Sequence, residues 1–90
     1  MEIVTVLHVC EEGWHKFTSP ELPGLYMIVP QDDLGAAYAD LPRAIEELIY
    51  ADTGKRVSAQ PQKTFGDCLS AIARTQDPIP QHYSIEFKAA

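Results

Sequence analysis

The chain has few basic residues, few cysteines and no long apolar run. Lysine and arginine account for 7 of its 90 residues against 13 acidic ones, which gives a net charge of −6. Nucleic-acid binding needs clustered Lys and Arg, so the composition argues against it and favours a basic protein as partner. No apolar run approaches the roughly 20 residues of a membrane-spanning helix. An acid near the start replaces the basic residues of a secretory signal, and we expect a cytoplasmic protein.

The two cysteines, Cys10 and Cys68, are far apart and form no C-x-x-C pair. We expect both to be reduced core residues, not a disulfide or nucleophiles. His8, Cys10 and His15 have an H-x-C-x4-H spacing across the first hairpin, but no fourth ligand is near, which argues against structural zinc. The glycines are isolated, so no Gly-rich phosphate-binding loop is present.

The first half of the chain predicts an antiparallel meander within one domain spanning residues 1–90. A strand at 2–10 has aliphatic residues on both faces, which indicates a central strand. Residues 11–13 (EEG) predict a three-residue hairpin loop with glycine at the left-handed position. Further strands are predicted at 14–18 and 25–29. The prolines and glycine at 19–24 favour a rigid, extended segment between these two strands, which we call the crossing.

One long amphipathic helix is predicted after the meander. Gln31, Asp32 and Asp33 suit a helix start, because acidic side chains complement the positive end of the helix dipole. The apolar residues that follow at helical spacing are Leu34, Tyr38, Leu41, Ile45, Leu48 and Ile49. Pro42 lies inside this pattern and is expected to kink or reset the helix, which should end near Gly54.

The second half predicts less regular structure. Residues 55–63 are polar and indicate at most a short strand, and Thr64 can cap a second, short helix. Alternation over 82–88 predicts a half-buried edge strand. The predicted fold class is therefore α+β: a three-stranded antiparallel meander plus a fourth C-terminal strand, in the order 3-2-1-4. One long helix packs on this sheet, and a second short helix completes a βββααβ order.

Several motifs in the first half occur together. They are the acidic-Gly turn before Trp14, the S-P-E-L-P-G-L segment at 19–25, the D-D-L helix start at 32–34 and the L-P-x-x-I-x-x-L-I pattern at 41–49. Over residues 2–52 the chain thereby resembles the HicB family of antitoxins. The resemblance implies a truncated, non-catalytic ribonuclease-H-like fold that binds HicA, a small basic RNA-cleaving toxin, and covers its active site. Many members add a C-terminal DNA-binding domain, but residues after 60 show no helix pair or basic face for one.

No catalytic residue, metal or cofactor is expected. A metal nuclease of the parent fold would need carboxylates at the centre of the first strand, where Thr5, Val6 and Leu7 stand. The candidate partner-binding residues are instead an aromatic anchor, its neighbour and acidic side chains: Glu11, Glu12, Trp14, His15, Asp32, Asp33, Glu46 and Glu47.

Each candidate also has an ordinary structural interpretation. Trp14 suits a core position, Asp32 and Asp33 suit the helix cap, and the other carboxylates suit a solvated surface. The alternative function is a stand-alone regulatory or scaffolding dimer module that pairs through the edge strand at 82–88.

Overall fold

The computed structural model describes residues 2–64, 66–67 and 78–88. In chain order the elements are β1 (Glu2–Glu11), β2 (Trp14–Thr18), β3 (Tyr26–Pro30), the 3-10 turn η1 (Gln31–Asp33), α1 (Leu34–Thr53), β4 (Val57–Pro61) and β5 (Ile79–Phe87). The described strands form one antiparallel sheet in the order β3-β2-β1-β5-β4. The α+β class is confirmed.

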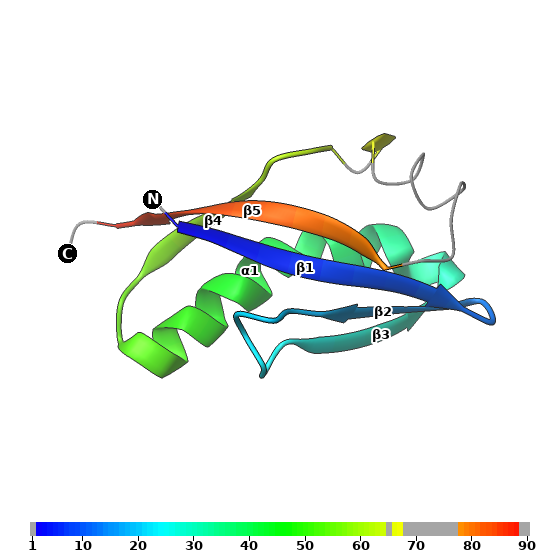
Figure 1. Ribbon diagram of the computed structural model, residues 1–90, viewed down its shortest axis with the longest axis horizontal. Helices are drawn as coiled ribbons and strands as arrows, with labels where there is room; N and C mark the ends of the chain where they lie inside the picture. The colour runs from blue at the N-terminus through cyan, green and yellow to red at the C-terminus, as the bar shows by residue number, and fades with distance from the viewer. Residues whose placement is uncertain (1, 65, 68–77, 89–90) are drawn as a thin grey trace.

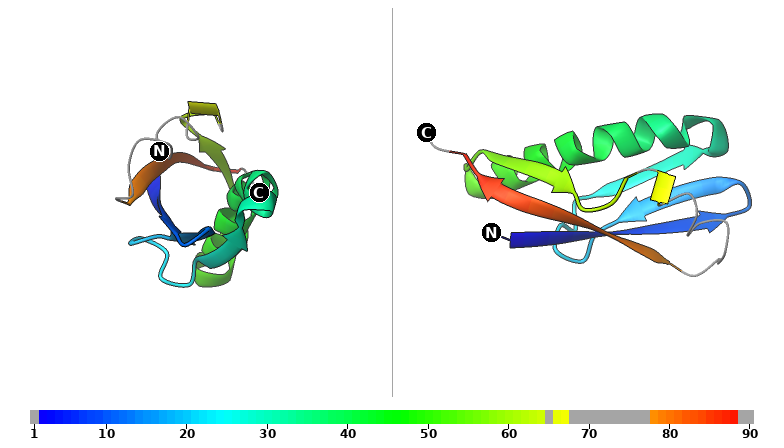
Figure 2. Two further views of the ribbon diagram at one scale, coloured as in Figure 1. Left: turned by 90° about the vertical axis from the view of Figure 1, so that its right-hand side faces the viewer. Right: turned by 90° about the horizontal axis from the view of Figure 1, so that it is seen from above.

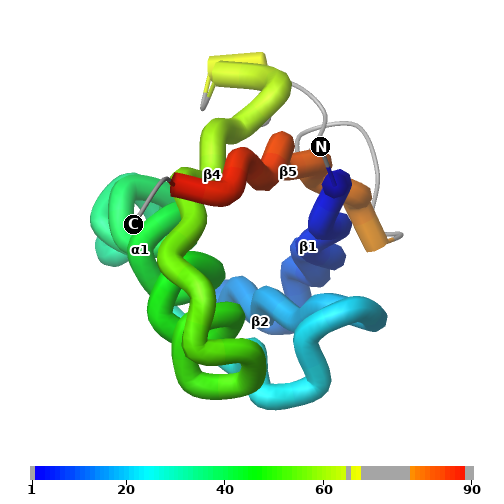
Figure 3. The backbone as a smooth tube through the Cα atoms, turned by 90° about the vertical axis from the view of Figure 1, so that its left-hand side faces the viewer, coloured from blue at the N-terminus to red at the C-terminus, as the bar shows by residue number. Residues whose placement is uncertain are grey.

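The sheet curls, and α1 closes the side that the sheet leaves open (Figures 1 and 2). Viewed along the long axis, strands and helix surround a central core (Figure 3). The buried apolar residues come from β1, β2, β4 and β5, from the segment between β2 and β3, and from α1. They are Val4, Val6, Phe17, Leu22, Leu25, Leu34, Ala37, Leu41, Ile45, Val57, Ala59, Tyr83 and Ile85. The helix contributes one face, as its apolar spacing predicts.

The turn between β1 and β2 is tighter than the predicted three-residue loop. Glu11 pairs with Trp14, so the loop contains only Glu12 and Gly13. Their φ angles are 51° and 83°, both left-handed. Positive φ at both loop positions is the geometry of a type I′ turn, whose twist matches that of the flanking strands. The predicted left-handed glycine is confirmed, and Glu12 shares its conformation.

The crossing between β2 and β3 is held by its own side chains. Leu22 and Leu25 are buried, and the Leu25 N–H donates to the Leu22 carbonyl at 2.9 Å. The Glu21 carboxylate accepts a hydrogen bond from the Thr5 N–H at 2.8 Å. Strand β2 pairs with β1 only from Leu7 onward, so Glu21 bonds β1 beyond the end of β2. The crossing therefore extends the hydrogen bonding of β1 as well as reversing the chain.

Helix α1 begins and ends where the sequence indicates, with differences in detail. Asp33 occupies the position before the first turn but makes no side-chain cap hydrogen bond. Gly54 ends the helix with φ 72°, and its N–H donates to the Tyr50 carbonyl at 2.8 Å. The helix continues through Pro42 from Leu34 to Thr53. None of the described helices is long and apolar enough to cross a membrane.

Replacing Pro42 is expected to stabilise the fold. Proline in a helix interior costs about 3 kcal/mol and cannot donate to the carbonyl four residues earlier, so Pro42→Ala should raise the free energy of unfolding by about 1–3 kcal/mol. Urea unfolding followed by circular dichroism measures this change. Pro20→Ala, in the crossing, is the control and should lower stability slightly, because it frees the unfolded chain. A lower midpoint for Pro42→Ala would mean that packing requires the ring.

The C-terminal half corrects the predicted sheet. Residues 57–61 form β4, so the described sheet has a fifth strand, and its order extends 3-2-1-4 by one strand. Strand β5 lies beside β1 as predicted but is not an edge strand, because β4 pairs with its other side. Buried Val57 and Ala59 pack β4 into the core, a contact that the polar composition conceals. The second helix predicted from Thr64 lies largely outside the described residues.

Candidate protein-binding surface and a buried histidine pair

Three large apolar side chains are exposed on the outer face of β2 and β3. His15 and Phe17 point into the core, so alternation turns Trp14 outward. Trp14 is 51% exposed, Tyr26 65% and Ile28 50%. The strand register places Trp14 beside Pro30 and Lys16 beside Ile28. We call Trp14, Tyr26 and Ile28 the outer strip; Trp14 is therefore exposed and is not a core aromatic.

Four exposed carboxylates lie around the Trp14 end of this strip. Glu11 pairs with Trp14 across the hairpin, and Glu12 is in the turn itself. Asp32 and Asp33 follow Pro30, the other cross-strand neighbour of Trp14. The hairpin turn and η1 lie at the same end of the molecule (Figure 1). We call these four carboxylates the acidic end; the fold brings them together around one aromatic residue.

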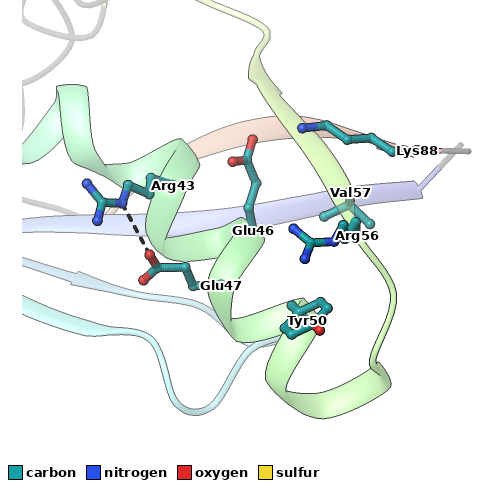
Figure 4. Close-up of a pocket in the computed structure, with 7 residues that line it drawn as sticks. All are labelled: Arg43, Glu46, Glu47, Tyr50, Arg56, Val57 and Lys88. Atoms are coloured by element: carbon teal, nitrogen blue, oxygen red, sulfur yellow. Dashed lines mark hydrogen bonds and ion pairs between the residues drawn. The ribbon is translucent and has the colours of Figure 1, made fainter. Parts of the chain in front are cut away.

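The other two predicted carboxylates lie elsewhere. Glu46 and Glu47 are on α1 and line a pocket of about 300 Å³ together with Arg43, Tyr50, Arg56, Val57 and Lys88 (Figure 4). Glu47 pairs with Arg43 at 3.1 Å, and Glu46 accepts the Ala59 N–H of β4 at 2.9 Å. The guanidinium of Arg56 lies over the ring of Tyr50, 5.1 Å from its centroid. This pocket has mixed charge and does not extend the acidic end.

His15, the remaining predicted residue, is buried with His8 in the core. Each is 1% exposed, and His8 Nε2 lies 2.8 Å from His15 Nδ1. Tyr38 of α1 places its hydroxyl 2.8 Å from His8 Nδ1. At the other end, Gln31 Oε1 lies 2.6 Å from His15 Nε2. A continuous hydrogen-bonded chain thus runs from the helix through β1 and β2 to η1.

The chain of hydrogen bonds is satisfied with either one or two protons on His8. In one arrangement the Tyr38 hydroxyl donates to His8, His8 donates through Nε2 to His15, and His15 donates through Nε2 to the Gln31 carbonyl oxygen. In the other, His8 carries a proton on both nitrogens and donates through Nδ1 to the Tyr38 oxygen and through Nε2 to His15. One added proton therefore breaks no hydrogen bond, but it places a charge in the core.

The surroundings of His8 oppose that charge. Its ring stacks on Phe17 with centroids 4.5 Å apart and meets Tyr38 edge-on. Burial, and then repulsion by His15, lowers the pKa of His8 from 6.5 to about 4. His8 is therefore neutral near pH 7.

The histidines do not form a metal site in this arrangement. Their facing nitrogens bond each other, and Cys10 Sγ is 4.0 Å from His15 Nε2, the nitrogen that faces Gln31. No cluster of three or more His, Cys, Asp or Glu side chains suited to a metal ion occurs within the described part of the chain. The group is a buried polar network.

The network joins the core to the acidic end. Gln31 immediately precedes Asp32 and Asp33, and its side chain bonds His15, the sequence neighbour of Trp14. The alternation along the strands could have predicted that both histidines are buried. His8 lies on the same face of β1 as buried Val4 and Val6, and His15 on the same face of β2 as Phe17. Gln31 and Tyr38 had no such signal as partners, since they come from different elements.

The acidic end, the outer strip and the histidine network together form the candidate site. No family model, curated protein or solved structure gives a match to this chain, so the resemblance to HicB antitoxins rests on the sequence motifs.

Proposed function

We propose that this chain is a non-enzymatic, HicB-like antitoxin domain that binds and inhibits a small basic RNA-cleaving toxin of the HicA type. The observation that carries the proposal is Trp14, half exposed at the centre of the acidic end. Tryptophan and tyrosine are the commonest anchors of protein interfaces, and flanking charge selects a partner of opposite sign. The excess of acidic residues over the whole chain supports the same partner.

The two parts of the site have separate roles in binding, and inhibition follows from where the bound domain lies. The acidic end attracts a basic protein and raises the association rate, an effect that salt weakens. The outer strip then supplies apolar contact that slows dissociation. Inhibition is steric: the bound domain covers the surface on which the toxin holds RNA, and no bond is made or broken by the antitoxin.

Trp14→Ala is expected to weaken toxin binding about 30-fold or more, since loss of an interface anchor costs about 2 kcal/mol or more. The toxin to test is the product of the adjacent gene, and co-expression should rescue growth with the wild-type chain. Calorimetry with purified proteins gives the affinity. Phe87→Ala is the matched control, because Phe87 is 52% exposed but lies at the far end of β5. Equal affinities for the two variants would contradict the assigned surface.

The alternative, a regulatory or scaffolding dimer module, has one observation in its favour. The predicted pairing edge at 82–88 is unavailable, because β5 lies between β1 and β4. Strand β3, however, is at an edge of the described sheet. A chain that forms dimers and binds no basic ribonuclease would favour this second function.

A further inference from the structure

The pocket between α1, β4 and the end of β5 gathers almost half of the basic residues of this acidic chain. Arg43, Arg56 and Lys88 line it, which is three of the seven lysines and arginines. Its volume of about 300 Å³ is at the lower end of the range for small-molecule sites. It lies on the C-terminal half of α1, away from the hairpin turn and the acidic end (Figures 1 and 4). The pocket is therefore separate from the surface proposed for the toxin.

Two opposite charges in this pocket are each fixed by a contact of their own. Glu46 is half-buried, and its Oε2 accepts the Ala59 N–H of β4 at 2.9 Å. The guanidinium of Arg56 lies over the Tyr50 ring, 5.1 Å from its centroid. A guanidinium that stacks on an aromatic ring keeps its N–H groups available at its edge for hydrogen bonds. Both charged groups are therefore preorganised before a ligand arrives.

These opposite charges do not neutralise each other. Arg43 is paired with Glu47 at 3.1 Å. Within the described residues, no ion pair joins Glu46 to Arg56 or to Lys88, although all three line the pocket. Figure 4 shows the cationic ends of Arg56 and Lys88 directed to the side on which the Glu46 carboxylate lies. A ligand in this pocket can therefore meet both signs of charge at once.

We propose that the pocket binds a small zwitterion, an α-amino acid with an apolar side chain. Its carboxylate accepts hydrogen bonds from Arg56 and Lys88, and its ammonium group donates to Glu46 Oε1, since Oε2 already accepts from β4. Guanidinium and carboxylate are complementary planar groups, and charge-assisted hydrogen bonds are the stronger ones. The apolar side chain lies against Tyr50, which is 48% exposed, beside buried Val57.

The pocket's own carboxylate favours a zwitterion over a simple anion. With Arg43 and Glu47 paired, the remaining charges are one negative and two positive. An anion alone would bring a second carboxylate close to Glu46, and like charges repel in a partly buried site. An α-amino acid carries an ammonium group next to its carboxylate, so Glu46 and Arg56 both gain a partner. Because its two charges cancel, the net charge of −6 on the chain does not repel it.

Titration of the full chain with L-leucine, followed by nuclear magnetic resonance at constant ionic strength and near-neutral pH, tests the proposal. The backbone amide signals of Tyr50, Arg56 and Lys88 should shift and saturate. Two matched ligands each lack one of the charges: isocaproate has no ammonium group, and isoamylamine has no carboxylate. Each should bind at least about tenfold more weakly than leucine, because hydrogen bonds to a charged group are lost.

Two variants separate the two ends of the ligand. Arg56→Gln should weaken leucine binding about tenfold and leave isoamylamine binding unchanged, because that ligand has no carboxylate. Glu46→Gln should weaken leucine binding similarly without weakening isocaproate, while its side-chain carbonyl still accepts the Ala59 N–H. Lys55→Gln is the matched control and should leave leucine binding intact. It removes a positive charge one residue away, but Lys55 lies over Phe87 at 5.6 Å and does not line this pocket.

Three kinds of result overturn the amino-acid site. One is a titration without saturable shifts up to about 10 mM leucine. Another is isocaproate or isoamylamine binding as tightly as leucine. The third is undiminished leucine binding in folded Arg56→Gln, or an equal loss in Lys55→Gln. Circular dichroism checks folding, and Lys88→Gln replaces Arg56→Gln, with the same expectation, if the latter unfolds.

The amino-acid site and the proposed toxin binding can fail separately. Trp14 does not line the pocket, so Trp14→Ala should impair toxin binding and leave leucine binding unchanged. Arg56→Gln should do the reverse, because Arg56 lies outside both the acidic end and the outer strip.

Discussion

Phe17→Ala is expected to unfold the domain or bring it close to unfolding. Phe17 is fully buried, stacks on the His8 ring at 4.5 Å and meets Tyr38 edge-on at 5.4 Å. Removing a buried phenylalanine side chain costs about 3–5 kcal/mol. A domain of this length has a total stability of roughly 5–13 kcal/mol. The substitution would also leave a cavity beside a polar pair that depends on dry, close packing.

Urea unfolding followed by far-ultraviolet circular dichroism measures the loss. Phe17→Leu should cost less, because leucine refills part of the cavity. Phe87→Ala is the exposed control and should change stability by no more than about 0.5 kcal/mol. A Phe17→Ala variant within about 1 kcal/mol of the wild type would show that β2 and α1 do not pack as described.

Acid is expected to destabilise the domain before most carboxylates titrate. The unfolded chain binds a proton at His8 near pH 6.5, whereas the folded chain binds it near pH 4. Between these values the unfolded state holds more protons, so the free energy of unfolding falls as the pH falls. The contribution of His8 is complete above pH 6.5. By pH 4 the loss reaches about 3 kcal/mol, since one unit of pKa corresponds to about 1.4 kcal/mol.

The groups that face His8 make it the source of this loss. His15 approaches it from β2 and Tyr38 from α1, and no described carboxylate bonds it. Urea unfolding at several pH values between 7 and 4.5 measures the dependence. His8→Gln removes the titrating group but keeps polar atoms for both neighbours, so its stability should vary less with pH.

His82→Gln is the matched control for this dependence. His82 is exposed on β5, with Nδ1 3.2 Å from the Thr5 hydroxyl, and should leave the wild-type pH profile unchanged. Identical acid losses in the wild type and His8→Gln would assign the effect to other groups.

Acid sensitivity bears on the proposed function through the histidine network. The histidine network holds Gln31, and through it the turn that carries Asp32 and Asp33. Loss of that network would therefore be felt at the acidic end as well as in overall stability.

The sequence by itself determined the hairpin, the third strand, the limits of the long helix and the central place of β1. Each depends on neighbours within one turn or one strand: glycine at a left-handed position, apolar spacing along a helix, aliphatic residues on both faces of a strand. Alternation over residues 82–88 likewise predicted Tyr83, Ile85 and Phe87 to be buried. Tyr83 and Ile85 are, but Phe87 is 52% exposed at the end of β5.

Only the tertiary structure decided the neighbours of each element. The polar residues 57–61 become a strand because Val57 and Ala59 are buried between α1 and β5, which the local composition does not show. His8 and His15 become a buried pair because Tyr38, thirty positions from His8, and Gln31, sixteen from His15, supply their hydrogen bonds. Burying a polar group costs free energy unless it has hydrogen-bond partners, and here the long-range packing supplies those partners. The same packing places β3 and β4, and not the last strand, at the edges of the described sheet.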